Sequence, residues 1–258
     1  MTQLATQTID QDEVISAADE AQAKELKGMF EAGVHFGSAR SRRHPKMEPY
    51  IFGIRNNVEV FDLAKVKAKL DLAAEFVRKL GSEHKVVVFV GTKLDIADLT
   101  EKAAKEAGMP YARARWIGGL ISNFPSIKKR MDHYEDLKAK QASGELEKYT
   151  KKEQLEISRE ITKLAKNFGG LVALKKLPDA LIVIDPMAED VAVAEAKGKR
   201  IPVIGVVNSD SDPELVTYPI PANDSSRTSV DFILTYLAKA YQEGLASIVA
   251  VVPAPSAN

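Results

Sequence analysis

The sequence of 258 residues contains no cysteine and a single tryptophan, Trp116. Without cysteine there can be no disulfide, no thiolate metal site and no cysteine nucleophile, and a reducing compartment is the natural environment. No apolar run approaches the roughly 18 residues that a membrane-spanning helix needs. The longest runs, VVVFV and ALIVI, have the length of strands. The composition therefore predicts neither a disulfide-stapled secreted domain nor a membrane protein.

Signatures of catalysis and of metal binding are also missing. Neither the Walker A pattern nor G-x-G-x-x-G occurs, and no serine stands in G-x-S-x-G. The four histidines form no H-x-x-x-H or H-x-E pair, so we expect no zinc site. His35, in GVHFG, is the only one in an apolar setting, and we expect a packed, hydrogen-bonded histidine rather than a catalytic one.

Acidic residues are scarce in two windows of a chain whose formal net charge is zero. Residues 38–58 hold one carboxylate, Glu48, and residues 111–130 hold none. The cations of the first window are Arg40, Arg42, Arg43, Lys46 and Arg55, and those of the second are Arg113, Arg115, Lys128, Lys129 and Arg130. Two runs of cations, one with a single carboxylate and the other with none, favour contact with phosphates over a merely solvated face.

The hydrophobic pattern predicts an α/β protein with a doubly wound, mainly parallel sheet. KVVVFVGTK, DALIVIDP and IPVIGVVN read as strands buried on both faces, and YIFGIRNNVEVF as two short strands around Asn56-Asn57. Helices are expected at 22–32, 63–80, 95–107, 188–197 and 225–244, the last ending at Gly244. Residues 1–22 read as a flexible acidic leader, 23–125 and 169–245 as the two parts of the α/β domain, and 246–258 as a tail.

A helical hairpin is expected at 126–168, between the two parts of the α/β domain. Both segments are rich in charge, SGELE supplies the turn, and Thr150 with Glu153 forms a capping box. Coiled-coil spacing extends over about two heptads, through Ile127, Met131, Tyr134, Ile157, Ile161, Leu164 and Phe168. The mixed charge on the outer faces predicts that the hairpin projects from the body.

The ends of two strands suggest an alternative function. The chain could be a doubly wound enzyme that binds a phosphorylated metabolite or nucleotide at these ends. FVGTK at 89–93 lies between a strand and a helix, where backbone N–H groups can hold a phosphate. Asp185, Asn208, Asp210 and Asp212 could in principle gather Mg²⁺, although Asp and Ser before Pro more often form turns. RARWIGGLISNF at 113–124 places Trp116 beside Arg115 and ahead of a Gly-Gly pair. Tryptophan usually fills a core, but beside arginine it can also stack on bases.

Several motifs, in order, resemble the bacterial small-subunit ribosomal protein S2 family. They are AGVHFG, PKMEPYIFGIRN, RWIGGLISN, LPDALIVIDP, IPVIGVV with DPELV, and IPAND, and the resemblance spans roughly residues 26–243. Each motif is weak alone, but their order and spacing are highly specific. Departures from the family pattern stand at Ser38, Arg43, His44, Asn208, Ala222 and Thr228.

The resemblance implies a flavodoxin-like α/β domain with a protruding coiled-coil hairpin. It implies a structural constituent of the cytoplasmic ribosome that supports assembly and translation, with no enzymatic activity and no cofactor. The implied partners are small-subunit rRNA, neighbouring small-subunit proteins and ribosomal protein S1, with no membrane and no homo-oligomer. The ten cations of the two windows would then contact rRNA phosphates. A scaffold that binds protein partners through the hairpin alone is a third hypothesis.

Overall fold

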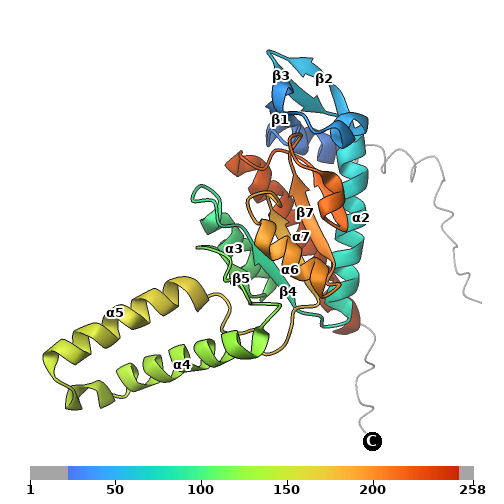
Figure 1. Ribbon diagram of the computed structural model, residues 1–258. Coiled ribbons are helices and arrows are strands. Elements are labelled where there is room, and N and C mark those ends of the chain that lie inside the picture. The colour runs from blue at the N-terminus through green and yellow to red at the C-terminus, as the bar shows by residue number, and fades with distance from the viewer. Residues whose placement is uncertain (1–22, 250–258) are drawn as a thin grey trace, which may run out of the picture.

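The computed structural model describes residues 23–249, except for the side chains of residues 147, 248 and 249 (Figure 1). The expected leader, 1–22, and residues 250–258 of the expected tail lie outside the described residues. A parallel five-stranded sheet in the order β5-β4-β6-β7-β8 forms the centre. Its strands are β4 (Val87–Val90), β5 (Tyr111–Ala112), β6 (Ala180–Ile184), β7 (Val203–Val207) and β8 (Tyr218–Pro221). Numbered along the chain this order is 2-1-3-4-5, which confirms the flavodoxin-like fold.

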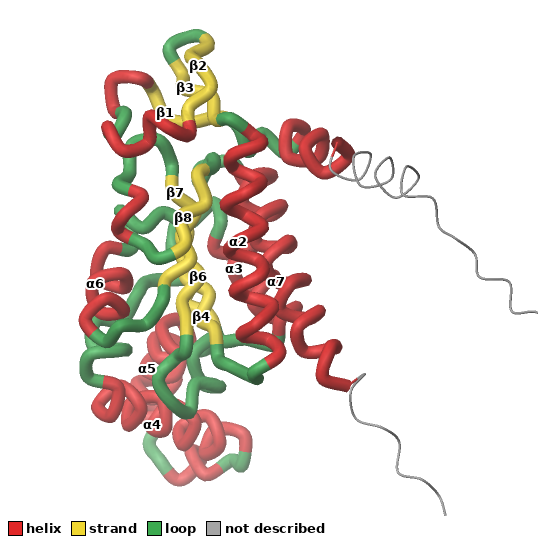
Figure 2. The backbone as a smooth tube through the Cα atoms, turned by 90° about the vertical axis from the view of Figure 1, so that its right-hand side faces the viewer, coloured by secondary structure: helices red, strands yellow, loops and turns green. Residues whose placement is uncertain are grey.

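Helices cover both faces of this sheet, and this explains why β4, β6 and β7 are apolar and buried at every position. Figure 2 shows α2 (Leu63–Ser82), α3 (Ala97–Ala107) and α7 (Arg227–Val249) on one side and α6 (Asp190–Gly198) on the other. In α2 the expected stripe of Val66, Leu70 and Val77 is completely buried. Within residues 23–249, no helix combines the length and the apolar character needed to cross a bilayer.

Helix α7 contradicts one sequence prediction, because it continues through Gly244 to Val249. A Cβ at Gly244 would lie 2.0 Å from the carbonyl oxygen of Arg78, and one at Gly81 would lie 2.3 Å from that of Tyr241. Both distances are too short for any side chain. The two glycines therefore allow α2 and α7 to cross in close contact, and Gly244 is a packing residue rather than a helix terminator.

A small antiparallel sheet sits at the end of the fold beyond β7 and β8 (Figure 2). It has the order β1-β3-β2, with β1 (Phe36–Ala39), β2 (Ile51–Arg55) and β3 (Val58–Phe61). Asn56 and Asn57 have φ of 50° and 62°, so both adopt the left-handed conformation that a tight hairpin turn requires. The sequence predicted β2 and β3 but not β1. Two 3-10 helices, Arg40–Arg42 and Pro45–Tyr50, join β1 to β2.

The helical hairpin is formed by α4 (Phe124–Ala142) and α5 (Lys151–Phe168), joined by a 3-10 turn at Glu145–Lys148. It occupies the connection between β5 and β6 and projects from the body (Figure 1). Thr150 and Glu153 form the expected capping box. Tyr134, Leu137 and Ile161 make a small separate core between the helices. Helix-on-helix packing thus holds the hairpin together, while regular coiled-coil geometry stays a prediction.

Candidate nucleic-acid interface

The ten predicted cations fall into two groups at opposite ends of the fold. Residues 40–55 belong to the small sheet and its connections, and residues 113–130 lie between β5 and the first turns of α4. Figure 1 and Figure 2 both place the small sheet and the hairpin at opposite ends of the main sheet. The two sequence windows therefore form two separate surfaces rather than one continuous patch.

Three arginines of the first group form what we call the small-sheet surface: Arg40, Arg42 and Arg55. All three are exposed, and within residues 23–249 none of them has a carboxylate partner. The backbone N–H of Arg40 donates to the carbonyl oxygen of Asn57 at 3.0 Å, which ties the 3-10 turn to the β2–β3 turn. The backbone is thus fixed while the guanidinium groups stay available to an external anion.

The other two cations of the first group pair with carboxylates of the chain itself. Arg43 Nε lies 3.4 Å from Oε1 of Glu59, a carboxylate that is completely buried. Burial raises the pKa of Glu59, and the charge of Arg43 opposes that rise. Lys46 Nζ lies 3.0 Å from Asp212 and also pairs with Glu214. These contacts fasten the loop after β1 to the strand β3 and to the segment after β7.

The second group also divides into paired and unpaired cations. Arg113 Nη1 lies 2.5 Å from Glu101, and Lys128 Nζ lies 2.8 Å from Asp132 one helical turn away. Arg115, Lys129 and Arg130 are exposed, and in the described part of the chain they have no carboxylate partner. Asp132 is exposed and Glu101 is half-buried, so both pairs lie at the surface, where ion pairs contribute little to stability. An external anion can therefore compete for Arg113 and Lys128.

The fold adds two cations that the sequence windows missed, Arg159 and Lys163 of α5. They join Arg115 and Arg130 around a groove of about 830 Å³, the hairpin groove, where α4 and α5 meet the turn at 115–118. Residues four apart share one face of a helix, so their spacing was a usable signal. It was hidden because α5 mixes both charge signs along its length. Only the tertiary fold brings these side chains to Arg115.

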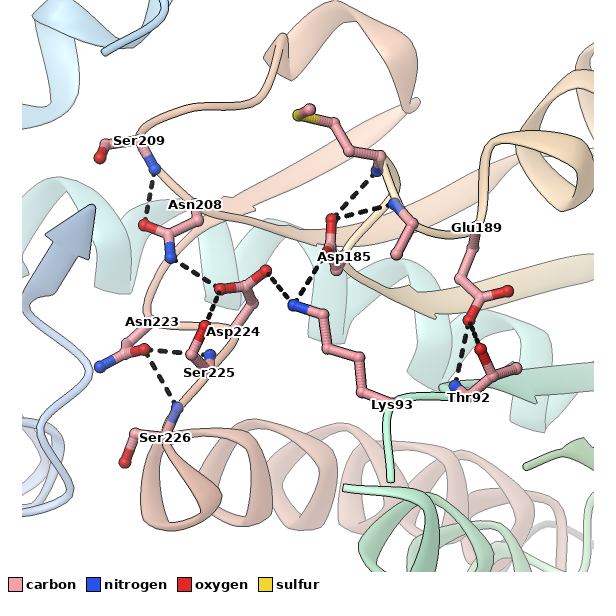
Figure 3. Close-up of polar contacts among 12 residues, drawn as sticks. Thr92, Lys93, Asp185, Glu189, Asn208, Ser209, Asn223, Asp224, Ser225 and Ser226 are labelled. Carbon is pink, nitrogen blue, oxygen red and sulfur yellow. Dashed lines mark hydrogen bonds and ion pairs between the residues drawn. The ribbon is translucent and has the colours of Figure 1, made fainter. Parts of the chain in front are cut away.

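The strand ends that suggested a ligand site are occupied by the protein's own side chains (Figure 3). Lys93 Nζ lies 2.6 Å from Asp185 and 3.0 Å from Asp224, and Asn208 donates to Asp224 at 2.7 Å. Burial alone would lower the pKa of Lys93, but its hydrogen bonds and the two charges outweigh burial and raise it. A cation already neutralised by two carboxylates is a poor phosphate receptor.

The backbone N–H group that follows β4 also has a hydrogen-bond partner within the protein (Figure 3). Oε1 of Glu189 accepts from the backbone N–H of Thr92 at 3.0 Å and from its hydroxyl at 2.5 Å. Burial raises the pKa of Glu189, and these hydrogen bonds oppose the rise. An internal carboxylate thus takes the place where a phosphate would bind.

The proposed Mg²⁺ ligands do not converge. Asp212 pairs with Lys46, whereas Asn208 bonds to Asp224. Across residues 23–249, no group of three or more His, Cys, Asp or Glu residues could hold a metal ion.

Two residues with open roles belong to the interior. Trp116 is buried in the main core, the more usual place for a tryptophan, and so it is not free to stack on a base. His35 is buried and stacks on Phe30 with ring centroids 4.4 Å apart. Burial, followed by the charge of Arg55, lowers its pKa. We expected the ring to be hydrogen-bonded, and this prediction is wrong for Nδ1, which has no hydrogen-bond partner among the described residues.

Comparisons with known proteins agree with the resemblance in the motifs. Residues 29–244 match the family described as Ribosomal protein S2. Small ribosomal subunit protein uS2 of Dictyoglomus thermophilum is 43% identical over 219 residues, which cover 85% of this chain and 89% of the relative. The protein of the same name from Thermus thermophilus is 42% identical over 210 residues, 81% of this chain and 82% of the relative. That of Fusobacterium nucleatum is 42% identical over 229 residues, 88% and 93%.

The family match covers most of the chain, and the relatives are far above the identity at which only a fold is shared. The sheet order, the projecting hairpin and the ordered motifs all lie within the matched residues. This chain therefore belongs to the ribosomal protein S2 family.

Proposed function

We propose that this chain is a structural constituent of the small ribosomal subunit, that it binds small-subunit rRNA, and that it catalyses no reaction. Its relatives carry the name small ribosomal subunit protein uS2. A role in assembly and translation follows from that placement. The site for this function is a pair of phosphate-binding surfaces rather than a catalytic pocket.

One observation carries the proposal more than any other. In the described part of the chain, exposed cations without carboxylate partners gather at the two ends of the fold. The strand ends where doubly wound enzymes bind ligands instead hold Lys93, Asp185 and Asp224 in a closed network. Unpaired guanidinium groups on a surface suit a polyanion, because phosphate contacts release counterions from the nucleic acid. The closed network leaves little room for a metabolite.

All ten cations remain proposed RNA contacts, with roles that differ according to their partners. Those without a carboxylate partner would contact phosphates directly. Those with a partner would hold the loops that present the others. Arg113 and Lys128 can exchange their partners, the half-buried Glu101 and the exposed Asp132, for phosphate. The unpaired set within residues 23–249 is Arg40, Arg42, Arg55, Arg115, Lys129 and Arg130, and the paired set is Arg43, Lys46, Arg113 and Lys128.

A sucrose gradient of a lysate that expresses the chain tests the proposal. We expect the chain to migrate with small subunits and to remain there after a high-salt wash. A chain that stays at the top of the gradient at both salt concentrations would overturn the proposal.

Variants then test the small-sheet surface. Arg40→Ala with Arg42→Ala should lower subunit occupancy by about tenfold, because each removes a charge-assisted phosphate contact. Lys197→Ala with Lys199→Ala removes two exposed cations near the end of α6 and serves as the matched control. Arg43 is left intact because it pairs with the buried Glu59, so its loss would disturb the fold as well. Equal occupancy of both double variants would reject this surface.

We further propose that a neighbouring ribosomal protein, ribosomal protein S1, docks on an aromatic patch of the small sheet. Phe30 is 58% exposed and Phe52 80% exposed, and both line a hollow of about 270 Å³ together with Phe36 and Ile54. Contiguous exposed apolar surface of this kind usually marks a contact with a partner. Its position beside Arg55 places it next to the small-sheet surface.

Substitution of the most exposed ring tests this docking. Phe52→Ser should reduce the amount of S1 that co-purifies with subunits while the chain itself stays bound. Leu94→Ser, at a residue that is 94% exposed and lies outside the patch, is the control. Unchanged S1 in the Phe52 variant would refute the patch. Loss of S1 only when residues 126–168 are deleted would support the hairpin as its binding site instead.

A further inference from the structure

The hairpin groove has the size of a ligand pocket and an apolar floor. Its volume of about 830 Å³ falls within the range of sites that enclose a small organic molecule. Ile117 of the turn and Leu164 and Phe168 of α5 line it, and all three pack in or against the main core. An apolar floor of this kind offers a surface to a flat aromatic ring.

The rim of the groove is strongly basic. Arg115, Arg130, Arg159 and Lys163 line it, and none of the four forms an ion pair with another residue between 23 and 249. Glu160 is the one carboxylate in the lining, and its Oε1 lies 3.3 Å from Nε2 of His133. Four unpaired cations around one hollow mark a place that more than one phosphate can occupy.

The shape of the groove decides between paired and unpaired RNA. Two packed helices have axes roughly 8–10 Å apart, so the hollow between α4 and α5 is too narrow to admit a duplex. A single unstacked nucleotide can enter, and proteins commonly read RNA by holding splayed bases against apolar or planar groups while cations hold the backbone. The combination of an apolar floor with a basic rim matches that division.

We propose that the hairpin groove binds an unpaired nucleotide of small-subunit rRNA, with the base against Ile117 and Leu164 and the flanking phosphates on the four cations. The inference rests on the proposed function and deepens it, because it assigns an RNA conformation and two residues of α5 to this surface. Arg159 and Lys163 become phosphate contacts of the same standing as Arg115 and Arg130.

Helix α5 also supplies a matched control. Lys166 lies on α5 and is exposed, but it does not line the groove. A change at Lys166 removes the same charge from the same helix as a change at Lys163. General electrostatic attraction predicts equal effects at the two positions, whereas a groove predicts unequal ones.

The experiment measures binding of the full-length chain to fluorescently labelled poly(U) and to duplex RNA by anisotropy across a range of salt concentrations. Arg159→Ala and Lys163→Ala should each weaken poly(U) binding by up to about tenfold, and each should reduce the slope of log K against log salt by about 0.7. Lys166→Ala should change neither quantity. Glu160→Gln should strengthen binding, since it removes the one negative charge in the lining, and a gain of affinity cannot arise from misfolding.

Several outcomes would overturn the groove. They are equal losses for Lys163→Ala and Lys166→Ala, no loss for Arg159→Ala, equally tight binding of duplex RNA with the same losses, or no binding of poly(U) by the unaltered chain. The gradient experiment separates this failure from that of the proposed function. If the unaltered chain migrates with small subunits and the groove variants match its occupancy and salt resistance, the groove is rejected while the ribosomal role stands. If the unaltered chain is absent from subunits, the ribosomal role itself fails.

Discussion

The carboxylate of Glu195 in α6 accepts a hydrogen bond at 2.9 Å from the backbone N–H of Ile121. The same carboxylate accepts from Gly119 at 2.5 Å and from Ser122 at 3.2 Å. These three N–H groups belong to the turn between β5 and α4, where Gly119 has a φ of 92° that favours glycine. A side chain of the sheet-covering helix thus fixes the turn from which the hairpin starts.

Glu195→Ala should loosen the hairpin without unfolding the body. It leaves three backbone donors without their acceptor, at a cost of about 1–3 kcal/mol that water at this half-buried site partly offsets. Hydrogen exchange should accelerate at residues 119–122 first, while the strands of the main sheet remain protected. Glu195→Gln keeps one carbonyl acceptor, so its exchange rates at residues 119–122 should lie between those of the unaltered chain and those of the Ala variant. Unchanged exchange at 119–122 in the Ala variant would contradict this role.

Gly244→Ala should destabilise the fold by about 1–3 kcal/mol or more, because the new methyl group would overlap the backbone of α2. A backbone carbonyl cannot move aside as a flexible side chain can. Gly198→Ala provides the control, since a Cβ there meets no atom within 4 Å, and alanine favours the helix by up to about 1 kcal/mol. Urea unfolding of the two variants should therefore give shifts of opposite sign. A stability for Gly244→Ala equal to that of the unaltered chain would refute the close crossing of α2 and α7.

The sequence was a sound guide wherever local pattern and tertiary structure agree. Strands β4, β6 and β7 are buried on both faces of the sheet, and their sequences are apolar at every position, so the local pattern was enough to predict them. The capping box at Thr150 is a contact between near neighbours, and it formed as expected. Strand β5 has two residues and β1 has four, too few for an alternating pattern to emerge, and both depend on partners distant in sequence.

The candidate site was predictable only in part, because it too depends on contacts between residues that are distant in sequence. Charge clusters along the chain identify cations but not their partners. Arg43, in the loop after β1, meets Glu59 of β3, and Lys46 meets Asp212 from 166 residues away, so neither pairing could be read from a local window. Arg159 was missed because Glu160 and other acids surround it in sequence, although it faces the groove in space. Gly244 was misread because a glycine near the end of a helix is more often a terminator than a close contact.

Glu59 predicts a specific pH dependence. Its pKa is raised above the ordinary carboxyl value, first by burial, with Arg43 opposing the rise and Glu48 adding to it. Between the unfolded-state pKa of Glu59 and its higher folded-state pKa, the folded state therefore binds more protons than the unfolded state. In that pH window the contribution of Glu59 to stability increases as the pH falls. It is complete below the unfolded-state pKa and is lost as the pH rises through the folded-state pKa.

A comparison with Glu59→Gln isolates this contribution from the carboxyl groups whose pKa values are lowered, such as Asp212 and Glu101, which act in the opposite direction. The free energy of unfolding of the unaltered chain should rise relative to that of the variant as the pH falls toward the ordinary Glu pKa, and then level off. Urea titrations at a series of pH values measure the difference. A difference that stays constant, or that changes in the opposite direction, would show that Glu59 is not held in a desolvated site.

Substitution of Lys93 tests whether the network at the strand ends is purely structural or forms a ligand-binding site. Lys93→Met leaves Asp185 and the nearly buried Asp224 without their cation, and we expect a loss of about 2–4 kcal/mol, below the range for a fully buried pair because the side chain of Lys93 is 33% exposed. Lys102→Met removes an exposed partner of Asp231 and should cost no more than about 0.5 kcal/mol.

Thermal unfolding with a panel of nucleotides and sugar phosphates completes this test. A ligand present at 100 times its Kd would add about 2.7 kcal/mol to the stability of the unaltered chain, and we expect no such shift because internal carboxylates already satisfy Lys93 and Thr92. Stabilisation of the unaltered chain by one of these ligands that disappears in Lys93→Met would mean that the network opens to a ligand. The enzymatic hypothesis would then regain support. A large stability loss without any ligand effect would mean that the ends of β4 and β6 serve only to hold the sheet together, which leaves the two basic ends of the molecule as its binding surfaces.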